Sequence, residues 1–184
     1  MIYKYNNCTS LTSVSLPSAV ESIGKNAFSG CTSLTEAHLN KVKTMGEYAF
    51  SGCTALTTID LGTALTAVSD HAFQNCPIES LDIPATVESI GNSAFYTTNA
   101  PSLTSVTFHE GLKSIGNSAF TVWNRAYKVN VASLQLPNSV VSIGDYAFRY
   151  WGAITELALP ASLETIGDLT FGECTALETI TFGK

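Results

Sequence analysis

Two short sequence motifs alternate along the whole 184-residue chain, and this repeat restricts the possible folds more than any other feature. The first motif reads Leu-x-x-Val-x-Leu-Pro, as at 11–17. The second reads Val-x-x-Ile-Gly-x-x-Ala-Phe, and its copies end at Phe28, Phe50, Phe73, Phe95, Phe120, Phe148 and Phe171. These phenylalanines are 22, 23, 22, 25, 28 and 23 residues apart. A period of this size predicts a solenoid, in which each repeat stacks on its neighbours.

Each motif also predicts its own local structure. The alternation of apolar and polar residues in the first motif predicts a strand that is buried on one face. Proline follows this strand in several copies, as at Pro17 and Pro137, and is expected to end it. The second motif is too short for a full helix, so we expect an extended piece followed by a helical turn at Ala-Phe. Its glycine, as at Gly91, predicts either a positive φ or a close approach of the backbone.

The segments 87–95 and 49–56 resemble the BspA-like leucine-rich repeats, and the resemblance covers essentially the whole chain. It implies a β-rich, right-handed leucine-rich repeat solenoid of about eight rungs of ~23 residues, with short helical turns between the strands. It also implies a non-catalytic protein-recognition module of a bacterial protein that is on the cell surface or secreted. Such a module would act in adhesion, by binding a host protein or glycan.

We expect residues 1–184 to form a single solenoid domain that is a fragment of a longer array, or whose ends meet another subunit. The chain begins inside one repeat and stops directly after a strand motif. Neither end carries the polar capping unit that a free-standing solenoid needs. Uncapped terminal rungs would also permit end-to-end self-association.

Composition narrows the classes of function. The 9 basic and 15 acidic side chains give a net charge of −6, which argues against a nucleic-acid partner. No apolar run approaches the ~18 residues of a spanning helix, so membrane insertion is not expected. The first twenty residues lack the profile of a signal peptide, so any export signal would lie outside this chain.

The cysteines follow the repeat. Cys31, Cys53, Cys76 and Cys174 each lie three residues after a repeat phenylalanine and therefore form a column. We expect all five cysteines, including Cys8, to be buried free thiols, because a column of small inward-facing side chains explains their spacing. A cross-rung disulfide and a metal site remain as alternatives.

One polar column of the strand motif places Ser15, His38 and Asp60 on adjacent rungs, in the order of a nucleophile, a base and an orienting acid. His38 and Asp60 could also join Asp82 and Glu36 at a metal ion. However, a flat, solvated sheet face has no oxyanion donors and does not exclude water. We therefore predict a solvated polar face, with no catalytic, metal-binding or cofactor-binding residue.

Three consecutive connections between a phenylalanine and the next strand depart from the repeat. The usual connection has five residues, but it has seven after Phe95 and ten after Phe120. After Phe148 the length is normal and the content becomes Arg-Tyr-Trp. In a solenoid, consecutive connections project side by side from one edge. They define a predicted binding patch of Tyr96, Trp123, Arg125, Tyr127, Lys128, Arg149, Tyr150 and Trp151.

Two interpretations of this edge stay open. Residues 120–151 carry three basic and one acidic side chain, a net charge of +2, and the rest of the chain totals −8. Tryptophan, tyrosine and arginine are enriched in interface hot spots, which favours a site for a protein or glycan ligand, or for self-association. Alternatively, Trp123 and Trp151 simply fill the core in the slot of the cysteine column. The chain would then be a structural spacer that holds other domains and has no ligand of its own.

Overall fold

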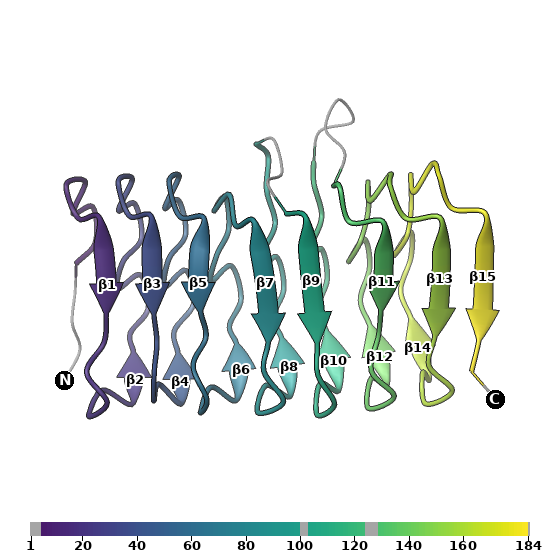
Figure 1. Cartoon of the computed structure of the whole chain (residues 1–184), viewed down its shortest axis with the longest axis horizontal. Coiled ribbons are helices and arrows are strands. Elements are labelled where there is room, and N and C mark those ends of the chain that lie inside the picture. The colour runs from purple at the N-terminus through teal and green to yellow at the C-terminus, as the bar shows by residue number, and fades with distance from the viewer. Residues whose placement is uncertain (1–4, 100–102, 124–128, 184) are drawn as a thin grey trace.

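The chain coils into a parallel β-solenoid in the computed structural model, which describes residues 5–99, 103–123 and 129–183. Each turn adds one strand to a front sheet and a two-residue strand to a rear sheet, and the two termini lie at opposite ends (Figure 1). The described residues form seven complete turns and an eighth front strand, close to the eight rungs expected. The right hand of the coil stays a prediction.

The front strands are β1 (Ser13–Ser15), β3 (Glu36–His38), β5 (Thr58–Asp60), β7 (Ser80–Ile83), β9 (Ser105–Phe108), β11 (Ser133–Gln135), β13 (Glu156–Leu159) and β15 (Thr179–Phe182). The rear strands are β2 (Ser22–Ile23), β4 (Thr44–Met45), β6 (Ala67–Val68), β8 (Ser89–Ile90), β10 (Ser114–Ile115), β12 (Ser142–Ile143) and β14 (Thr165–Ile166). Neighbouring strands pair in register, so that Val14 lies opposite Ala37 and Ala37 opposite Ile59.

The core is a set of side-chain columns that run the length of the coil. The seven repeat phenylalanines stack in one column that Tyr5 extends, with adjacent ring centroids 5.0–5.4 Å apart and ring planes within 13° of parallel. The inward residues of the front strands, such as Ala37 and Leu81, are buried beside it. The buried residues form one continuous hydrophobic cluster, against which the partly buried Phe95 and Phe171 pack, as stacking of similar repeats requires.

The helical turn expected at Ala-Phe is not confirmed, and the described residues contain no helix. This segment is a series of turns, closed by bonds such as Ala27 N–H to Gly24 O (3.3 Å) and Cys31 N–H to Phe28 O (3.2 Å). The residue two before each phenylalanine has a left-handed backbone, with φ of 58° at Asn26. A left-handed residue cannot continue a right-handed helix, so the chain turns at this point.

The recurring glycine permits a close approach of the backbone, which is the second of the two roles expected for it. A Cβ atom on Gly144 would lie 2.6 Å from the backbone nitrogen of Asn117 and 2.8 Å from the carbonyl carbon of Gly116. One rung therefore rests directly on the backbone of the previous one. The positive φ falls two residues later instead, on Tyr146 (59°).

The residue after this glycine forms a polar ladder along the rear of the coil. In five consecutive rungs it is Asp or Asn (in the first of them after Ser69 in place of the glycine), and in the first four its Oδ1 accepts the backbone N–H of the equivalent residue in the next rung. The distances are 2.7 Å from Asp70 to Asn92, 2.9 Å from Asn92 to Asn117, 2.9 Å from Asn117 to Asp145 and 2.7 Å from Asp145 to Asp168. Backbone N–H donors that face the previous rung are thus satisfied by its side chains.

Four of the five cysteines are buried free thiols, but the expectation for Cys8 is wrong, because this thiol is free and exposed. Each buried thiol donates a hydrogen bond to a carbonyl of the previous rung, such as Cys53 Sγ to Phe28 O and Cys76 Sγ to Phe50 O, both 3.1 Å. Cys8 occupies the same slot after Tyr5, but it lies on the first described rung, where none of the described residues stacks over it.

The front sheet divides in two where the longest connection is inserted. Its first part runs from β1 to β9 and its second from β11 to β15. Residues 121–130 are inserted in the chain directly before β11. The atypical connections therefore lie near the middle of the solenoid, where the front sheet divides.

Candidate binding edge

The three atypical connections are joined by backbone hydrogen bonds. Thr97 and Val122 form an isolated parallel bridge, and Thr97 N–H donates to Thr121 O at 3.0 Å. Trp123 N–H donates to Thr97 O at 2.9 Å, and Val122 N–H donates to Arg149 O at 3.4 Å. Trp123 is therefore held between the rung before it and the rung after it, and the expected side-by-side arrangement is confirmed for the described residues.

The two tryptophans have opposite surroundings. Trp151 is completely buried, and its Nε1–H donates to the Phe120 carbonyl at 2.9 Å. Its ring packs edge-on against Phe148, with the centroids 5.1 Å apart. Trp123 is 58% exposed. One tryptophan thus belongs to the core, and the other presents its ring at the surface.

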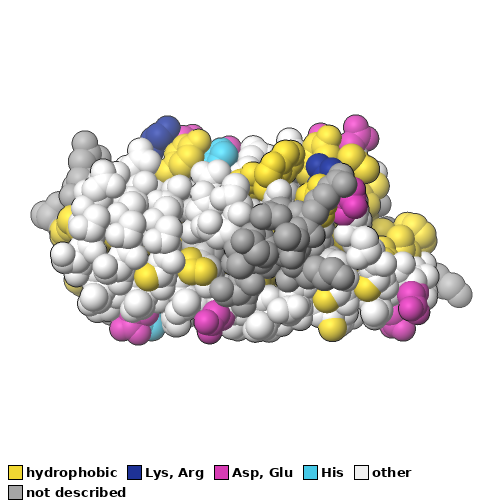
Figure 2. Space-filling model, turned by 90° about the horizontal axis from the view of Figure 1, so that it is seen from above, with side chains coloured by type: hydrophobic (Ala, Val, Ile, Leu, Met, Phe, Trp, Pro, Cys, Tyr) yellow, Lys and Arg dark blue, Asp and Glu magenta, His cyan; other side chains and the backbone are white. Residues whose placement is uncertain are grey.

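Arg149 lies among three aromatic rings. Its guanidinium carbon is 4.7 Å from the ring centroid of Tyr150, 5.3 Å from that of Tyr146 and 5.7 Å from that of Trp123. Cation–π contacts of this kind contribute about 0.5–2 kcal/mol each, depending on solvent exposure. Figure 2 shows the molecule from above, where several hydrophobic side chains and one basic side chain lie close together in the C-terminal half.

Tyr146 is a member of this cluster that the sequence patterns missed. It lies two residues before Phe148, at the position held by Asn26, Tyr48 and His71 in other rungs. Because tyrosine also occurs there in an ordinary rung, at Tyr48, the residue type alone does not indicate a binding site. The available signal was its spacing of three residues from Arg149, which a single tight turn brings together.

Tyr96 and Tyr150 are both half-buried at the edge. Burial raises the pKa of the Tyr96 hydroxyl above its usual value. Tyr150 has a φ of 69°, at the position that Gly30 and Gly52 occupy in earlier rungs. The remaining predicted patch residues, Arg125, Tyr127 and Lys128, lie outside the described residues.

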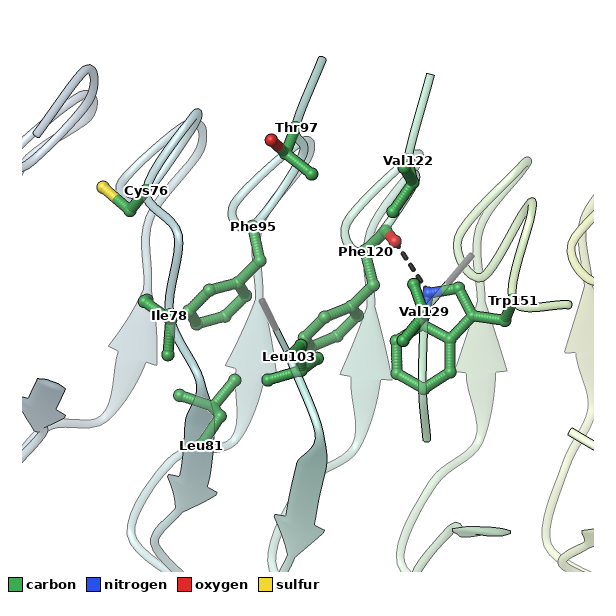
Figure 3. A pocket seen from close by; sticks show the side chains of 10 residues that line it. All are labelled: Cys76, Ile78, Leu81, Phe95, Thr97, Leu103, Phe120, Val122, Val129 and Trp151. Atoms are coloured by element: carbon green, nitrogen blue, oxygen red, sulfur yellow. Dashed lines mark hydrogen bonds between the residues drawn. The ribbon is translucent and has the colours of Figure 1, made fainter. Parts of the chain in front are cut away.

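A small cavity lies in the core directly behind this edge, where the cysteine column is interrupted (Figure 3). Its volume is about 30 Å³, and apolar side chains line most of it, from Cys76 at one end to the Trp151 indole at the other. The two rungs between them carry Thr98 and Trp123 in the cysteine slot, and both side chains are exposed. The cavity is therefore a packing gap left by residues that moved outward, not a ligand site.

The polar column of the front sheet is in register but open to solvent. Ser15 pairs with His38, and His38 with Asp60. The His38 Nδ1 atom lies 3.7 Å from an Asp60 carboxylate oxygen, and these side chains are 40% and 58% exposed. Within the described parts of the chain, no hydrogen bond joins Ser15 to His38 and no three potential metal ligands cluster. The arrangement is an exposed polar face.

The parallel coil, its stacked phenylalanines and its period of about 23 residues define a leucine-rich repeat solenoid. The BspA type leucine rich repeat region matches the chain in six copies, over residues 2–101 and 98–184. The chain therefore belongs to the BspA-type leucine-rich repeat family, which places it among protein-interaction or structural repeat modules. A comparison with curated proteins found no match.

Solved structures support the same fold. A leucine rich cell surface protein from Faecalibacterium prausnitzii A2-165 superposes with a TM-score of 0.62 at 24% identity. The match covers 98% of this chain and 62% of that protein, so this chain spans less than two thirds of its length. The leucine rich repeat protein of T. pallidum gives a TM-score of 0.59 at 26% identity, over 93% of this chain and 72% of that one. No described segment forms a helix that could cross a membrane.

Proposed function

We propose that the chain is a non-catalytic recognition module of a bacterial surface protein, acting in adhesion to a host protein or glycan. Its binding edge consists of Tyr96, Trp123, Tyr146, Arg149 and Tyr150. Surface location is supported by the family and by the Faecalibacterium relative, which is described as a cell surface protein.

The observation that carries this proposal is the exposure of the Trp123 side chain on a backbone that is held in place. Its ring is 58% exposed, although hydrogen bonds through Thr97 and its neighbour Val122 hold its backbone in place. A large aromatic residue whose backbone is already held in place loses less conformational freedom when a partner covers it. Exposed aromatics beside arginine are typical of interface hot spots.

A structural spacer is the second candidate function, and the burial of Trp151 favours it. This tryptophan, one of the two that suggested a binding edge, is explained entirely by packing and one hydrogen bond. The continuous column of stacked rings would also suit a spacer that keeps other domains apart.

Binding measurements on one exposed aromatic distinguish these functions. The purified chain would be tested against a panel of extracellular-matrix proteins and glycans, together with Trp123→Ala. Tyr48→Ala serves as the control, because Tyr48 is an aromatic on a distant rung, where it stacks on His71 at 4.5 Å. Circular dichroism confirms that each variant folds. Binding that Trp123→Ala loses and Tyr48→Ala keeps supports recognition at the edge, and a folded parent that binds nothing on the panel supports the spacer.

A further inference from the structure

We propose that Arg149 determines the specificity of this edge, by taking a carboxylate from an acidic segment of a protein ligand. The inference rests on the proposed function and names the chemistry of its ligand. The ligand residue would present an Asp or Glu side chain to Arg149 and an apolar neighbour to Trp123.

The aromatic rings around Arg149 leave its charge uncompensated. The rings of Tyr150, Tyr146 and Trp123 lie 4.7–5.7 Å from the guanidinium carbon, at distances where a cation contacts a ring face. Such contacts attract a cation without neutralising it. A carboxylate binds in the guanidinium plane through two parallel hydrogen bonds, and the two Nη atoms can supply both, since the Nε atom is buried.

Arg149 also differs from three of the four described lysines in having no acidic partner. Lys25, Lys43 and Lys113 each meet a glutamate from an adjacent rung at 2.5–2.7 Å. Cross-rung ion pairs are thus the usual way in which this solenoid neutralises a cation. No Asp or Glu of the described residues lies within 4.0 Å of the Arg149 guanidinium, so its charge is available to a ligand.

One polar atom of Arg149 is left without a partner. The Nε atom is buried and has no hydrogen-bond partner among the described residues, which destabilises the folded state. The left-handed φ of the next residue, Tyr150 (69°), is shared by Asn75 (61°) and Glu173 (64°) at the same position of other rungs, so it belongs to the fold and not to this edge.

The charge of the chain favours a single carboxylate over a polyanion. The chain carries a net charge of −6, and Arg149 is the one cation of this edge among the described residues. An extended polyanion such as a nucleic acid or a sulfated glycan would be repelled by the rest of the chain. One acidic side chain beside an apolar one fits both this single cation and the exposed ring of Trp123.

The test is a nuclear magnetic resonance titration of the parent chain, which requires no variant to fold. Two blocked peptides serve as probes, acetyl-Gly-Leu-Asp-Leu-Gly-amide and the same peptide with Asn in place of Asp. We expect the Asp peptide to shift the Nε–H signal of Arg149 and the indole N–H signal of Trp123, and to leave that of Trp151 unchanged. The Asn peptide should bind about ten times more weakly, since it offers no charged acceptor.

Variants then assign the preference to one side chain. Arg149→Gln should lower the preference for Asp over Asn to about one, and Arg149→Lys should lower it in part, because lysine lacks the planar fork. Trp123→Ala should weaken both peptides equally. The charge control is Lys41→Gln, since Lys41 contacts only the Thr63 hydroxyl among the described residues, at 3.0 Å, and lies on a distant rung. It should leave the preference unchanged.

The outcomes separate this inference from the proposed function. Equal binding of both peptides, or a preference that survives Arg149→Gln, overturns the role of Arg149 and leaves recognition through Trp123 standing. If the chain binds sialyllactose and not the Asp peptide, the proposal of a protein carboxylate is wrong, and the proposal of recognition at this edge stands. If neither probe shifts any signal and the protein panel is also negative, both proposals fail.

Discussion

Trp123 and Trp151 occupy equivalent places in the sequence, but different hydrogen bonds hold them. In rungs with a buried cysteine, the N–H of the residue three after the phenylalanine donates to that phenylalanine's carbonyl, as Cys53 does to Phe50 at 3.2 Å. The N–H of Trp123 donates to Thr97 of the previous rung instead, and its side chain lies at the surface. Trp151 is buried, and its indole donates to the Phe120 carbonyl at 2.9 Å.

Replacing each tryptophan by phenylalanine should separate the two environments. Trp151→Phe leaves the buried Phe120 carbonyl without its indole donor, so we expect the free energy of unfolding to fall by about 1–3 kcal/mol. Trp123→Phe should change it by less than about 0.5 kcal/mol, because that ring is largely exposed. Urea unfolding followed by circular dichroism measures both. Equal losses in the two variants would contradict the assignment of one ring to the core.

The thiols should differ in reactivity. Burial raises the pKa of Cys174 from 9.0 to about 11, so this thiol stays protonated and unreactive at pH 8. A thiol reagent should therefore modify Cys8 rapidly in the folded chain and all five cysteines only after unfolding. In Cys8→Ser the rapid phase should disappear. A rapid phase of more than one thiol would show that the column is open to solvent.

The same pKa shift predicts a loss of stability in alkali. Because the folded state keeps the Cys174 proton that the unfolded chain releases, this contribution to stability is complete below about pH 9. It is lost as the pH rises from about 9 to about 11. Urea titrations at several pH values measure the effect. In Cys174→Ala this part of the pH dependence should be missing.

Among the elements, the polar ladder at the rear is the clearest case of one rung stabilising the next. It begins only at Asp70, because the first two rungs carry Lys25 and Glu47 in this position, joined by an ion pair of 2.5 Å. Asn117→Ala removes the acceptor for the backbone N–H of Asp145 and should lower the free energy of unfolding by about 0.5–1.5 kcal/mol. Asn117→Asp keeps the acceptor and should have a smaller effect. Matching losses in urea unfolding would mean that the side-chain acceptor contributes nothing.

The regular elements could be predicted because their cause lies in the sequence itself. A phenylalanine at nearly constant spacing has to stack on its neighbours, and the polar–apolar alternation sets which face of each strand is buried. The backbone angles could not be predicted in this way. Periodicity identified the glycine at 144 as special, but only the packing of rungs shows that it needs space, and that the left-handed residue is Tyr146.

The candidate site was predictable only in its location. Consecutive irregular connections have to be neighbours in a solenoid, and the bridge between Thr97 and Val122 confirms this. Whether a tryptophan points inward or outward depends on the packing and hydrogen bonds of its rung, such as the indole bond of Trp151, and the residue pattern does not encode these. For the same reason, the contact of Arg149 with Tyr146 emerged only from the turn that joins them.

At the scale of the whole molecule, the last rung leaves its stacking surface uncovered. Ile166, Leu169, Ile180 and Phe182 are 50%, 56%, 46% and 74% exposed. We expect the isolated chain to associate end to end as its concentration rises, because this surface repeats the one on which each inner rung packs. Sedimentation velocity over a range of concentrations measures the association.

Ile180→Thr together with Phe182→Thr should reduce this association by removing apolar area from the terminal rung. Val141→Thr is the matched control, since Val141 is also exposed, at 37%, but lies on the flank of the coil. A chain that stays monomeric at every concentration would contradict end-to-end association. Equal effects of the two changes would point to a contact through the flank.

The hydrogen bonds between rungs run along the long axis of the coil, from one strand to the next (Figure 1). Force applied between the two ends would therefore load these bonds one rung at a time, as in opening a zipper, and would not shear many at once. Each rung released would free about 23 residues, or about 75 Å of extended chain. We expect a chain built in this way to lengthen in steps under tension, so that a rising pulling force is released one rung at a time.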